Sequence, residues 1–299
     1  MYPRGERGAG PDVKLAGMVL LAIPNVSEGR DRSAIDAIAR AFDARLLDLH
    51  LDGDHHRSVF TLAGAPGELA GAVVSGAAEA IRRVDLNRHA GIHPRVGAID
   101  VAPVVYLDPA DRGAACAEAL VLGDRLGNEL ELPVFLYGEL AGGRSRAELR
   151  RGGPARLSER IATGELRPDF GPRRLHPSAG AVLVAARPPL VAFNVELAPP
   201  ASLEDARRIA AIIREGGAEG LTAVRAIGLW LEASQVAQVS TNVEDHRATP
   251  LVAVVEAVAR HAAPLRAELV GLAPSAAFDG FPDDLAVLNR RTVEDALSK

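Results

Sequence analysis

The segment from residue 88 to 101 combines the side chains that acid–base chemistry needs. It contains two imidazoles, His89 and His93, together with the guanidinium of Arg95 and the carboxylate of Asp100. Histidine can both accept and donate a proton near neutral pH. Glycine and proline interrupt the segment, so we predict a loop that leads into a strand, where a rigid scaffold can present catalytic groups. The alternative interpretation is a pair of solvated loop histidines.

A second polar cluster precedes that loop, between residues 48 and 57. With His89 and His93 it offers enough nitrogen and oxygen ligands for the metal site of a hydrolase. The sequence has no H-E-x-x-H motif and no paired cysteines, so no metal is expected. The candidate ligands in this cluster are Asp48, His50, Asp52, Asp54, His55 and His56.

Composition excludes several classes of protein. The net charge of -5 gives no basic footprint for nucleic acid. Lysine occurs only at Lys14 and Lys299, which argues against a Schiff-base enzyme. The single cysteine, Cys116, forms no internal disulfide and suits a reducing, cytoplasmic compartment. The apolar run 18–23 is too short to span a membrane, and residues 1–17 are expected to be a disordered extension.

Hydrophobic periodicity predicts the element order βαββαβ twice along the chain. In the first half, Asp31 can cap a helix over 32–44, and Pro66 opens a longer helix to about residue 84. In the second half, Ser202 with Asp205 forms a capping box, and Thr249 followed by a proline predicts another helix start. The predicted strands are 19–23, 46–49, 58–62, 97–106, 191–197, 224–231, 235–240 and 267–272.

Two such units predict an α+β fold with two ferredoxin-like subdomains, 18–188 and 189–299. Each sheet would carry its helices on one face, and a ligand cleft would lie between the subdomains. Between the units we expect a helix over 112–130, a strand over 134–137 and an ordered loop over 168–181. In that loop, Gly171 and Gly180 would let backbone N–H groups approach a ligand.

Nine short motifs follow one another in a fixed order. Together they resemble the formiminotransferase family, the glutamate formimidoyltransferases. The motifs are I-P-N-V-S-E-G at 23–29, R-S-V-F-T at 57–61, H-x-G-x-H-P-R-x-G-A-x-D-V at 89–101, V-F-L-Y-G at 134–138, P-D-F-G-P at 168–172, P-S-A-G-A at 177–181, A-F-N-V at 192–195, A-Q-V-S-T-N at 237–242 and E-L-V-G-L at 268–272.

The resemblance implies a homodimeric transferase with two ferredoxin-like subdomains. Such an enzyme moves a formimino group from N-formimino-L-glutamate to the nitrogen at ring position 5 of tetrahydrofolate, its co-substrate, during histidine degradation. The family's catalytic histidine falls on His93. Its folate-contacting loop falls on Gly171, Pro172, Arg173, His176, Ser178 and Gly180.

The chemistry of transfer suggests roles for further residues. Asp100 or Asp48 could orient the catalytic imidazole. The substrate carboxylates need cations, for which Arg57, Arg95 and Arg187 are candidates, although each is as readily a surface ion pair. Two amides could hydrogen-bond the pterin or an amide group, although either alone is more readily a turn residue. They are Asn25 and Asn242.

Two positions depart from the animal-type pattern. His50 stands where those enzymes carry an acidic residue, and His56 stands where they carry an asparagine. A carboxylate would stabilise a cationic amidine better than an imidazole, so the donor is left open. The alternatives are folate-dependent formyl transfer, non-catalytic folate binding and the metal-dependent hydrolase. In each case the partners are small molecules, with no nucleic acid and no membrane.

Overall fold

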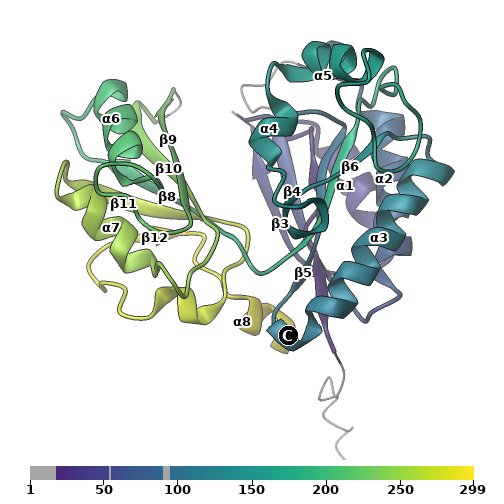
Figure 1. The fold of residues 1–299 in the computed structure, drawn as a ribbon. Helices are drawn as coiled ribbons and strands as arrows, with labels where there is room; N and C mark the ends of the chain where they lie inside the picture. Colours follow the sequence, from purple (N-terminus) through teal and green to yellow (C-terminus); the bar gives the residue numbers. More distant parts are fainter. Residues whose placement is uncertain (1–17, 54, 90–94, 233) are drawn as a thin grey trace, which may run out of the picture.

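The structure is a computed structural model that describes residues 18–53, 55–89, 95–232 and 234–299. It has an α+β fold, as predicted, built from two lobes that each contain one sheet (Figure 1). Residues 1–17, Asp54 and His93 lie outside the described residues, so the predictions made for them are not addressed by the structure.

The first sheet begins with the predicted βαββαβ order. Four strands of this unit lie side by side in the order β5, β1, β4 and β3, and each neighbouring pair is antiparallel. A two-residue strand, β2, continues β1 beyond Pro24 and pairs with β4 and β5. The bounds are β1 (Leu20–Ala22), β2 (Asn25–Val26), α1 (Arg32–Ala41), β3 (Arg45–Asp52), β4 (Arg57–Gly64), α2 (Leu69–Arg83) and β5 (Ile99–Tyr106).

The first lobe then extends this unit. Strands β6 and β7 add to the β5 edge in parallel, and β7 was not predicted. Two short helices, α4 and α5, were also not predicted. The bounds are α3 (Arg112–Glu129), β6 (Val134–Leu136), α4 (Arg146–Arg150), α5 (Gly153–Ala162) and β7 (Val182–Arg187), with one-turn 3₁₀ helices at Leu86–Arg88, Pro109–Asp111 and Gly138–Ala141.

The second sheet repeats the arrangement of the first unit. Its neighbours are β11, β8, β10 and β9, all antiparallel, and a short strand, β12, runs parallel to β11. The bounds are β8 (Val191–Leu197), α6 (Leu203–Ile213), β9 (Val224–Leu231), β10 (Val236–Val243), α7 (Leu251–Ala259), β11 (Pro264–Val270), β12 (Val287–Leu288) and α8 (Val293–Ser298), with a 3₁₀ helix at Ser275–Phe278.

Two of the three predicted caps are confirmed. The Asp31 carboxylate accepts from the N–H of Ala34, and Ser202 and Asp205 form the reciprocal capping box of α6. The Thr249 prediction was wrong, because Pro250 itself occupies the N-cap position of α7. The Thr249 hydroxyl instead donates 2.7 Å to the carbonyl of Thr222.

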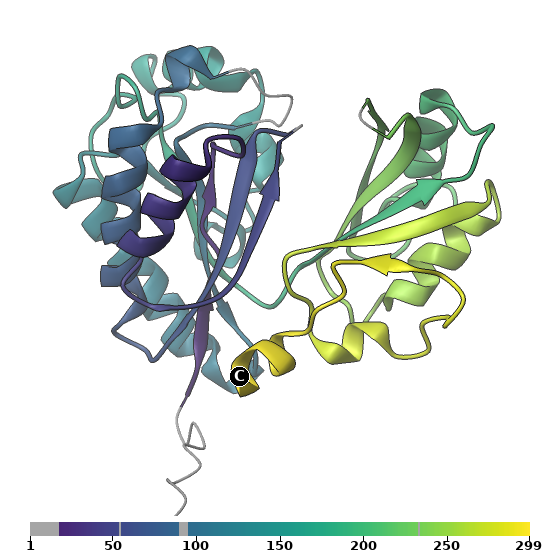
Figure 2. The same cartoon turned by 180° about the vertical axis from the view of Figure 1, so that it is seen from behind.

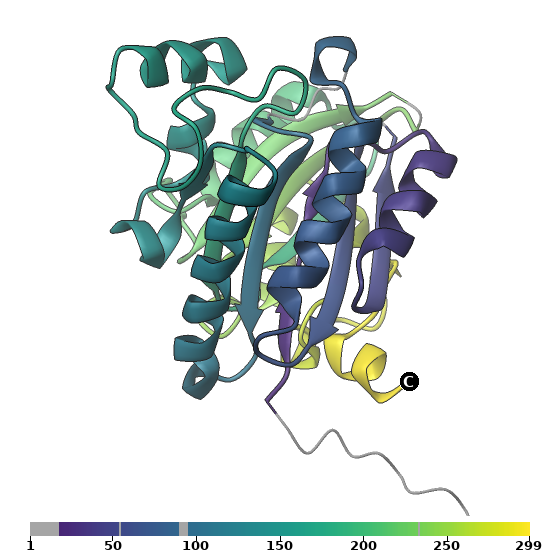
Figure 3. The same ribbon diagram turned by 90° about the vertical axis from the view of Figure 1, so that its right-hand side faces the viewer.

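Each lobe has a core between its sheet and its long helices. Helices α1, α2 and α3 cover one face of the first sheet, as Figure 3 shows, and α6 and α7 cover one face of the second. The helices of the two lobes lie on the outside, so the opposite faces of the two sheets look toward each other (Figure 2).

The expectation that helices cover only one face was wrong for the first sheet. Side chains from α4 and α5 form an apolar cluster on its other face, around Phe135 and Leu183. A second apolar cluster on that face contains Val293 and Ala296 of α8.

The C-terminal segment joins the lobes. From β12 beside the second sheet it crosses to β3 of the first, where α8 packs (Figure 1). Arg291 donates to the carboxylate of Asp48, and Arg45 donates to the carbonyls of Ala296 and Leu297 at 3.1 and 3.0 Å. No helix among the described residues is both long and apolar enough to cross a bilayer.

Candidate active site

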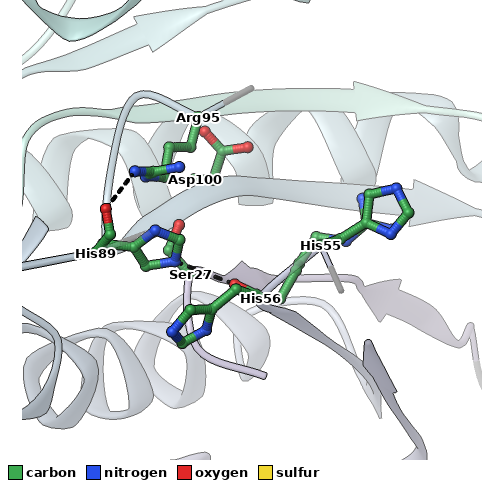
Figure 4. Close-up of a pocket in the computed structure, with 7 residues that line it drawn as sticks. Ser27, His55, His56, His89, Arg95 and Asp100 are labelled. Atoms are coloured by element: carbon green, nitrogen blue, oxygen red, sulfur yellow. Dashed lines mark hydrogen bonds between the residues drawn. The ribbon is translucent and has the colours of Figure 1, made fainter. Parts of the chain in front are cut away.

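A small pocket in the first lobe gathers imidazoles and guanidinia (Figure 4). The loop after β2, the turn between β3 and β4, the loop that precedes β5 and β5 itself supply its walls. It therefore combines segments that are far apart in sequence. The residues that line it are Ser27, His55, His56, Arg57, His89, Arg95 and Asp100.

Two imidazoles stack at one side of this pocket. The ring centroids of His56 and His89 are 4.2 Å apart, with 28° between the ring planes. The Nε2 of His89 is 3.2 Å from the backbone carbonyl of His56 and donates to it (Figure 4). Arg95 donates 3.0 Å to the carbonyl of His89. These contacts fasten the start of the predicted catalytic loop to the β3–β4 turn.

Local backbone geometry places the His56 ring. His56 has a φ of 52°, a left-handed conformation that non-glycine residues rarely adopt. Its Nδ1 accepts 3.1 Å from the N–H of Gly29, so in the neutral ring the proton resides on Nε2. The Glu28 carboxylate lies 3.4 Å from the same Nδ1.

Burial keeps both stacked rings neutral. It is the largest cause that lowers the pKa of His56, and Glu28 offsets this lowering only in part. Burial likewise lowers the pKa of His89, and the positive charge of Arg95 adds to the effect. Near neutral pH the pocket therefore contains two uncharged imidazoles that can accept protons.

Arg57 and Arg95 supply the positive charge of the pocket. Burial lowers the pKa of both groups, and the negative charge of Asp100 offsets this lowering for both. An arginine stays protonated in proteins under such shifts. Arg57 also lies within the electrostatic influence of Asp52, Arg150 and Arg146, so charges of both signs surround it.

Asp100, a predicted orienting carboxylate, lines the pocket, and both of its oxygens have partners. Oδ1 accepts 2.7 Å from the N–H of Val96, and Oδ2 receives a hydrogen bond from Arg150 of α4. Asp100 thus fixes the backbone two residues beyond the loop that contains His93. Whether it also touches that imidazole lies outside the described residues.

Asp48 was the alternative to Asp100 as the predicted orienting carboxylate. It does not line the pocket. It is buried on β3, and its partner is Arg291 of the C-terminal segment. Burial raises the pKa of Asp48, and Arg291 opposes that rise. The structure therefore shows a contact between this carboxylate and the C-terminal segment.

His55 turns away from the stacked rings (Figure 4). Its Nδ1 lies 2.5 Å from the carboxylate of Asp52. Burial acts to raise the pKa of Asp52, but hydrogen bonds with His55 prevail and lower it to about 2. Within the part of the chain that the structure describes, no three His, Cys, Asp or Glu side chains converge as metal ligands.

The predicted folate loop has two ends with different surroundings. At Gly171 a β-carbon would meet the carbonyl oxygen of Leu132 at 2.2 Å, and φ is +75°. At Gly180 it would meet the carbonyl oxygen of Val96 at 2.2 Å, and φ is +71°. Both positions therefore require glycine, the first to pack against the helix side of the sheet and the second to pack against the pocket segment.

The segment from His176 to Gly180 forms hydrogen bonds with residues that precede and follow the histidine loop in sequence. Ala98 donates 2.9 Å to the carbonyl of Ala179, and Leu86 donates 2.9 Å to the carbonyl of Ser178. The Nδ1 of His176 accepts from the N–H of Ala179 at 3.0 Å. This end of the predicted folate loop therefore lies next to residues that flank the predicted catalytic loop.

The remaining predicted residues lie outside the histidine pocket. Exposed Arg173 lines a separate depression beside the end of α5, and Pro172 is half-buried. Asn25 donates 3.0 Å to the carbonyl of Ile23, and Asn242 is half-buried on β10. Arg187 ends β7, where burial lowers its pKa and Tyr137 opposes that lowering.

Sequence reasoning missed two residues around the pocket. The Ser27 hydroxyl donates 2.8 Å to the carbonyl of Gly97, which ties the loop after β2 to the start of β5. Arg150 reaches Asp100 from α4. Ser27 lies inside the motif at 23–29, which is a signal for a role here, whereas nothing in the sequence around Arg150 indicates one.

Both lobes match domains of known proteins. Residues 19–187 match the formiminotransferase domain, N-terminal subdomain, and residues 192–279 match the formiminotransferase domain. The chain belongs to the formiminotransferase family.

Members of the formiminotransferase family that resemble the chain differ in length. The glutamate formimidoyltransferase of Thermoplasma acidophilum is 36% identical over 85% of this chain and 88% of its own length. That of Streptococcus pyogenes is 34% identical over 87% and 90%. The formimidoyltransferase-cyclodeaminase of Sus scrofa is 39% identical over 84% of this chain but only 49% of its own length. The chain thus spans about half the length of its curated animal relatives.

Proposed function

We propose that this protein transfers a formimino group from N-formimino-L-glutamate to tetrahydrofolate, which gives 5-formimino-tetrahydrofolate and glutamate. The observation that carries the proposal is that both lobes match formiminotransferase domains in order along the chain. Two relatives of similar length have the name glutamate formimidoyltransferase. Such a reaction belongs to histidine degradation and one-carbon metabolism.

The reaction requires two proton transfers that one imidazole can perform in turn. The ring nitrogen of tetrahydrofolate attacks the amidine carbon, which forms a new C–N bond and a tetrahedral intermediate. A proton leaves the attacking nitrogen, and a proton reaches the glutamate nitrogen as its C–N bond breaks. We assign this exchange to His93, with Asp100 positioning the segment next to it.

The cations of the pocket suit the carboxylates of the substrates. Arg57 and Arg95 line the pocket, and a guanidinium binds a carboxylate through two parallel hydrogen bonds. Both substrates have carboxylates, on the glutamate moiety in each case. We assign these two arginines to that role, and Arg187 remains a candidate for the tail of the folate.

The folate assignments extend along the glycine-bounded loop. We assign folate contact to the backbone between Gly171 and Gly180. The Gly180 end of this loop lies next to Val96, beside the pocket, and this position supports the assignment. The further members of this proposed contact set, on the loop and on the two sheets, are Pro172, Arg173, His176, Ser178, Asn25 and Asn242. Asp48 as an orienting carboxylate stays a prediction.

The architecture proposed with this function is a pair of ferredoxin-like subdomains, 18–188 and 189–299, with the ligand cleft between them. The strand orders β5-β1-β4-β3 and β11-β8-β10-β9 support it, because both follow from a βαββαβ unit folded in one antiparallel sheet. We further propose a cytoplasmic homodimer with tetrahydrofolate as co-substrate.

The deciding experiment compares two pairs of donor and acceptor. The purified protein is incubated with tetrahydrofolate and formiminoglutamate, and separately with 5-formyltetrahydrofolate and glutamate, and the one-carbon product is measured. We expect product in the first reaction, and we expect His93→Ala to reduce its rate by about 10²–10⁴-fold without unfolding the protein. Product only in the second reaction would assign formyl transfer instead. Folate binding without turnover in either would assign a binding protein.

A further inference from the structure

A carboxylate and an imidazole face each other from the two lobes. Ala267 and Leu269 pack into the helix-side core of the second sheet, so Glu268 between them points to the helix-free face. Leu49 and Leu51 pack on the helix side of the first sheet, which places His50 on its helix-free face. Figures 1 and 2 show that these two faces look toward each other.

Glu268 is held in position but its charge is not compensated. Its Oε2 accepts 3.2 Å from the amide of Asn194, the residue beside it in the β11–β8 register. No described Arg, Lys or His forms an ion pair with Glu268. Glu196, on the same face of the same sheet, differs because Arg266 donates 2.7 Å to its Oε2.

The facing imidazole does not neutralise Glu268. Burial is the largest influence on His50 and lowers its pKa, although the negative charges of Glu268, Asp52 and Asp48 act to raise it. The positive charge of Arg57 adds to the lowering. Near neutral pH the imidazole is therefore uncharged, and the negative charge of Glu268 remains available for a cationic ligand.

We propose that Glu268 recognises the cationic formimino group of the donor and so determines its specificity against neutral formyl analogues. This inference rests on the proposed function. A formamidine is a stronger base than imidazole and is protonated at neutral pH, whereas a formyl amide is neutral. The amidinium N–H groups would donate charge-assisted hydrogen bonds to the Glu268 carboxylate from the second lobe.

The charges around His50 match the two ends of such a donor. The guanidinium of Arg57 influences His50 from the first lobe, and the carboxylate of Glu268 influences it from the second. Formiminoglutamate carries carboxylates at one end and an amidinium at the other. Arg57 would hold a carboxylate and Glu268 the amidinium, with the neutral His50 between them.

The test uses a pair of ligands that differ only in the one-carbon group. N-formimino-L-glutamate and N-formyl-L-glutamate have the same carboxylates, and only the first is cationic at its formimino end. Their binding to the full-length protein is measured by calorimetry for the parent, Glu268→Gln and the matched control Glu196→Gln. We expect Glu268→Gln to weaken binding of the formimino ligand by about 10- to 100-fold and to leave the formyl ligand within about 3-fold. Glu196→Gln should leave the preference for the formimino ligand unchanged.

The possible outcomes separate this inference from the function on which it rests. If the parent transfers the formimino group but Glu268→Gln weakens both ligands equally, or neither, the assignment of Glu268 is wrong and the function stands. If the parent binds neither ligand and forms no product, the proposed function is wrong as well. Circular dichroism of each variant establishes that the fold is retained in these comparisons.

Discussion

The imidazole of His56 stacks on the imidazole of His89, with 4.2 Å between ring centroids, although 33 positions separate the two residues in sequence. The stack joins the β3–β4 turn to the beginning of the histidine loop. Burial lowers the pKa of both rings, so the contact is made between two neutral groups. Protonation would place two like charges face to face, which makes the stack sensitive to acid.

Acid should therefore weaken the fold at this site. In the unfolded chain each imidazole titrates near its ordinary pKa of about 6.5, whereas in the folded chain both pKa values are lower. Between these values the unfolded chain binds more protons, so the stability is fully present above about pH 7 and is lost progressively as the pH falls from about 6.5 through the lower folded-state pKa values. Urea unfolding across this range should show a falling free energy of unfolding.

The variant His56→Asn tests whether the stack causes this loss. Asparagine tolerates the left-handed backbone of position 56, so the turn can keep its shape. We expect a smaller loss of stability on acidification and a slower transfer rate. His246→Asn is the comparison, since burial also lowers the pKa of that imidazole but it lies in the second lobe. His246→Asn should reduce the loss of stability on acidification without slowing transfer. Acid sensitivity in His56→Asn equal to that of the parent would contradict the explanation.

Arg57 should act through the geometry of its guanidinium. Arg57→Lys keeps the positive charge in the pocket but removes the planar fork that matches a carboxylate. We expect KM for the donor to rise about 10-fold, equivalent to about 1.4 kcal/mol, with a smaller effect on kcat. Steady-state kinetics measure both constants. Arg45→Lys, at a guanidinium that binds the carbonyls of the C-terminal helix, should leave them unchanged.

Asp48 and Arg291 should contribute to stability as a pair. Arg291→Ala leaves the buried Asp48 carboxylate without that partner, and we expect a loss of about 1–3 kcal/mol in the free energy of unfolding. Adding Asp48→Asn to the same chain should recover part of the loss, because a neutral amide is less costly to bury. Denaturant midpoints of the parent and of these two variants measure this.

Asp48→Asn alone also tests the predicted catalytic role of Asp48. If the carboxylate only anchors the C-terminal segment, the folded variant should transfer the formimino group at the parental rate. A loss of kcat with normal stability would instead support the prediction that Asp48 orients the catalytic imidazole.

Sequence reasoning predicted the elements that depend on local signals. The Asp31 cap and the Ser202–Asp205 capping box lie within a few residues of the helices they start, and both are confirmed. Strand β7 was missed because it is an apolar run that pairs with β5 and β6, far from it in sequence. Helix α8 was missed because it is short and is stabilised by packing on β3.

The same distinction applies to the candidate site. The glycine and proline of the histidine loop, and the motif order, pointed to Arg57, Arg95 and Asp100, which all line one pocket. The partners of these groups could not be predicted, since Arg150 reaches Asp100 across 50 positions. The partner of Asp48 could not be predicted either, because Arg291 lies 243 positions away in the C-terminal segment.

The two glycines that bound the proposed folate loop offer a matched pair of variants. A methyl group at either position would meet a carbonyl oxygen at 2.2 Å, and both backbones are left-handed. We therefore expect Gly171→Ala and Gly180→Ala each to lower the free energy of unfolding by about 1–3 kcal/mol. Their effects on transfer should differ, because only Gly180 packs on Val96, whose N–H binds Asp100 in the pocket.

Measurements at a temperature where both variants are folded separate stability from function. Gly180→Ala should lower kcat by at least about 10-fold, since an error of about 1 Å in the position of catalytic groups is costly. Gly171→Ala should keep a kcat close to that of the parent, because the carbonyl it would displace belongs to Leu132, which lies between α3 and β6 and does not line the histidine pocket. Equal kcat losses in the two variants would show that the whole loop, and not only its end beside Val96, sets the geometry of transfer.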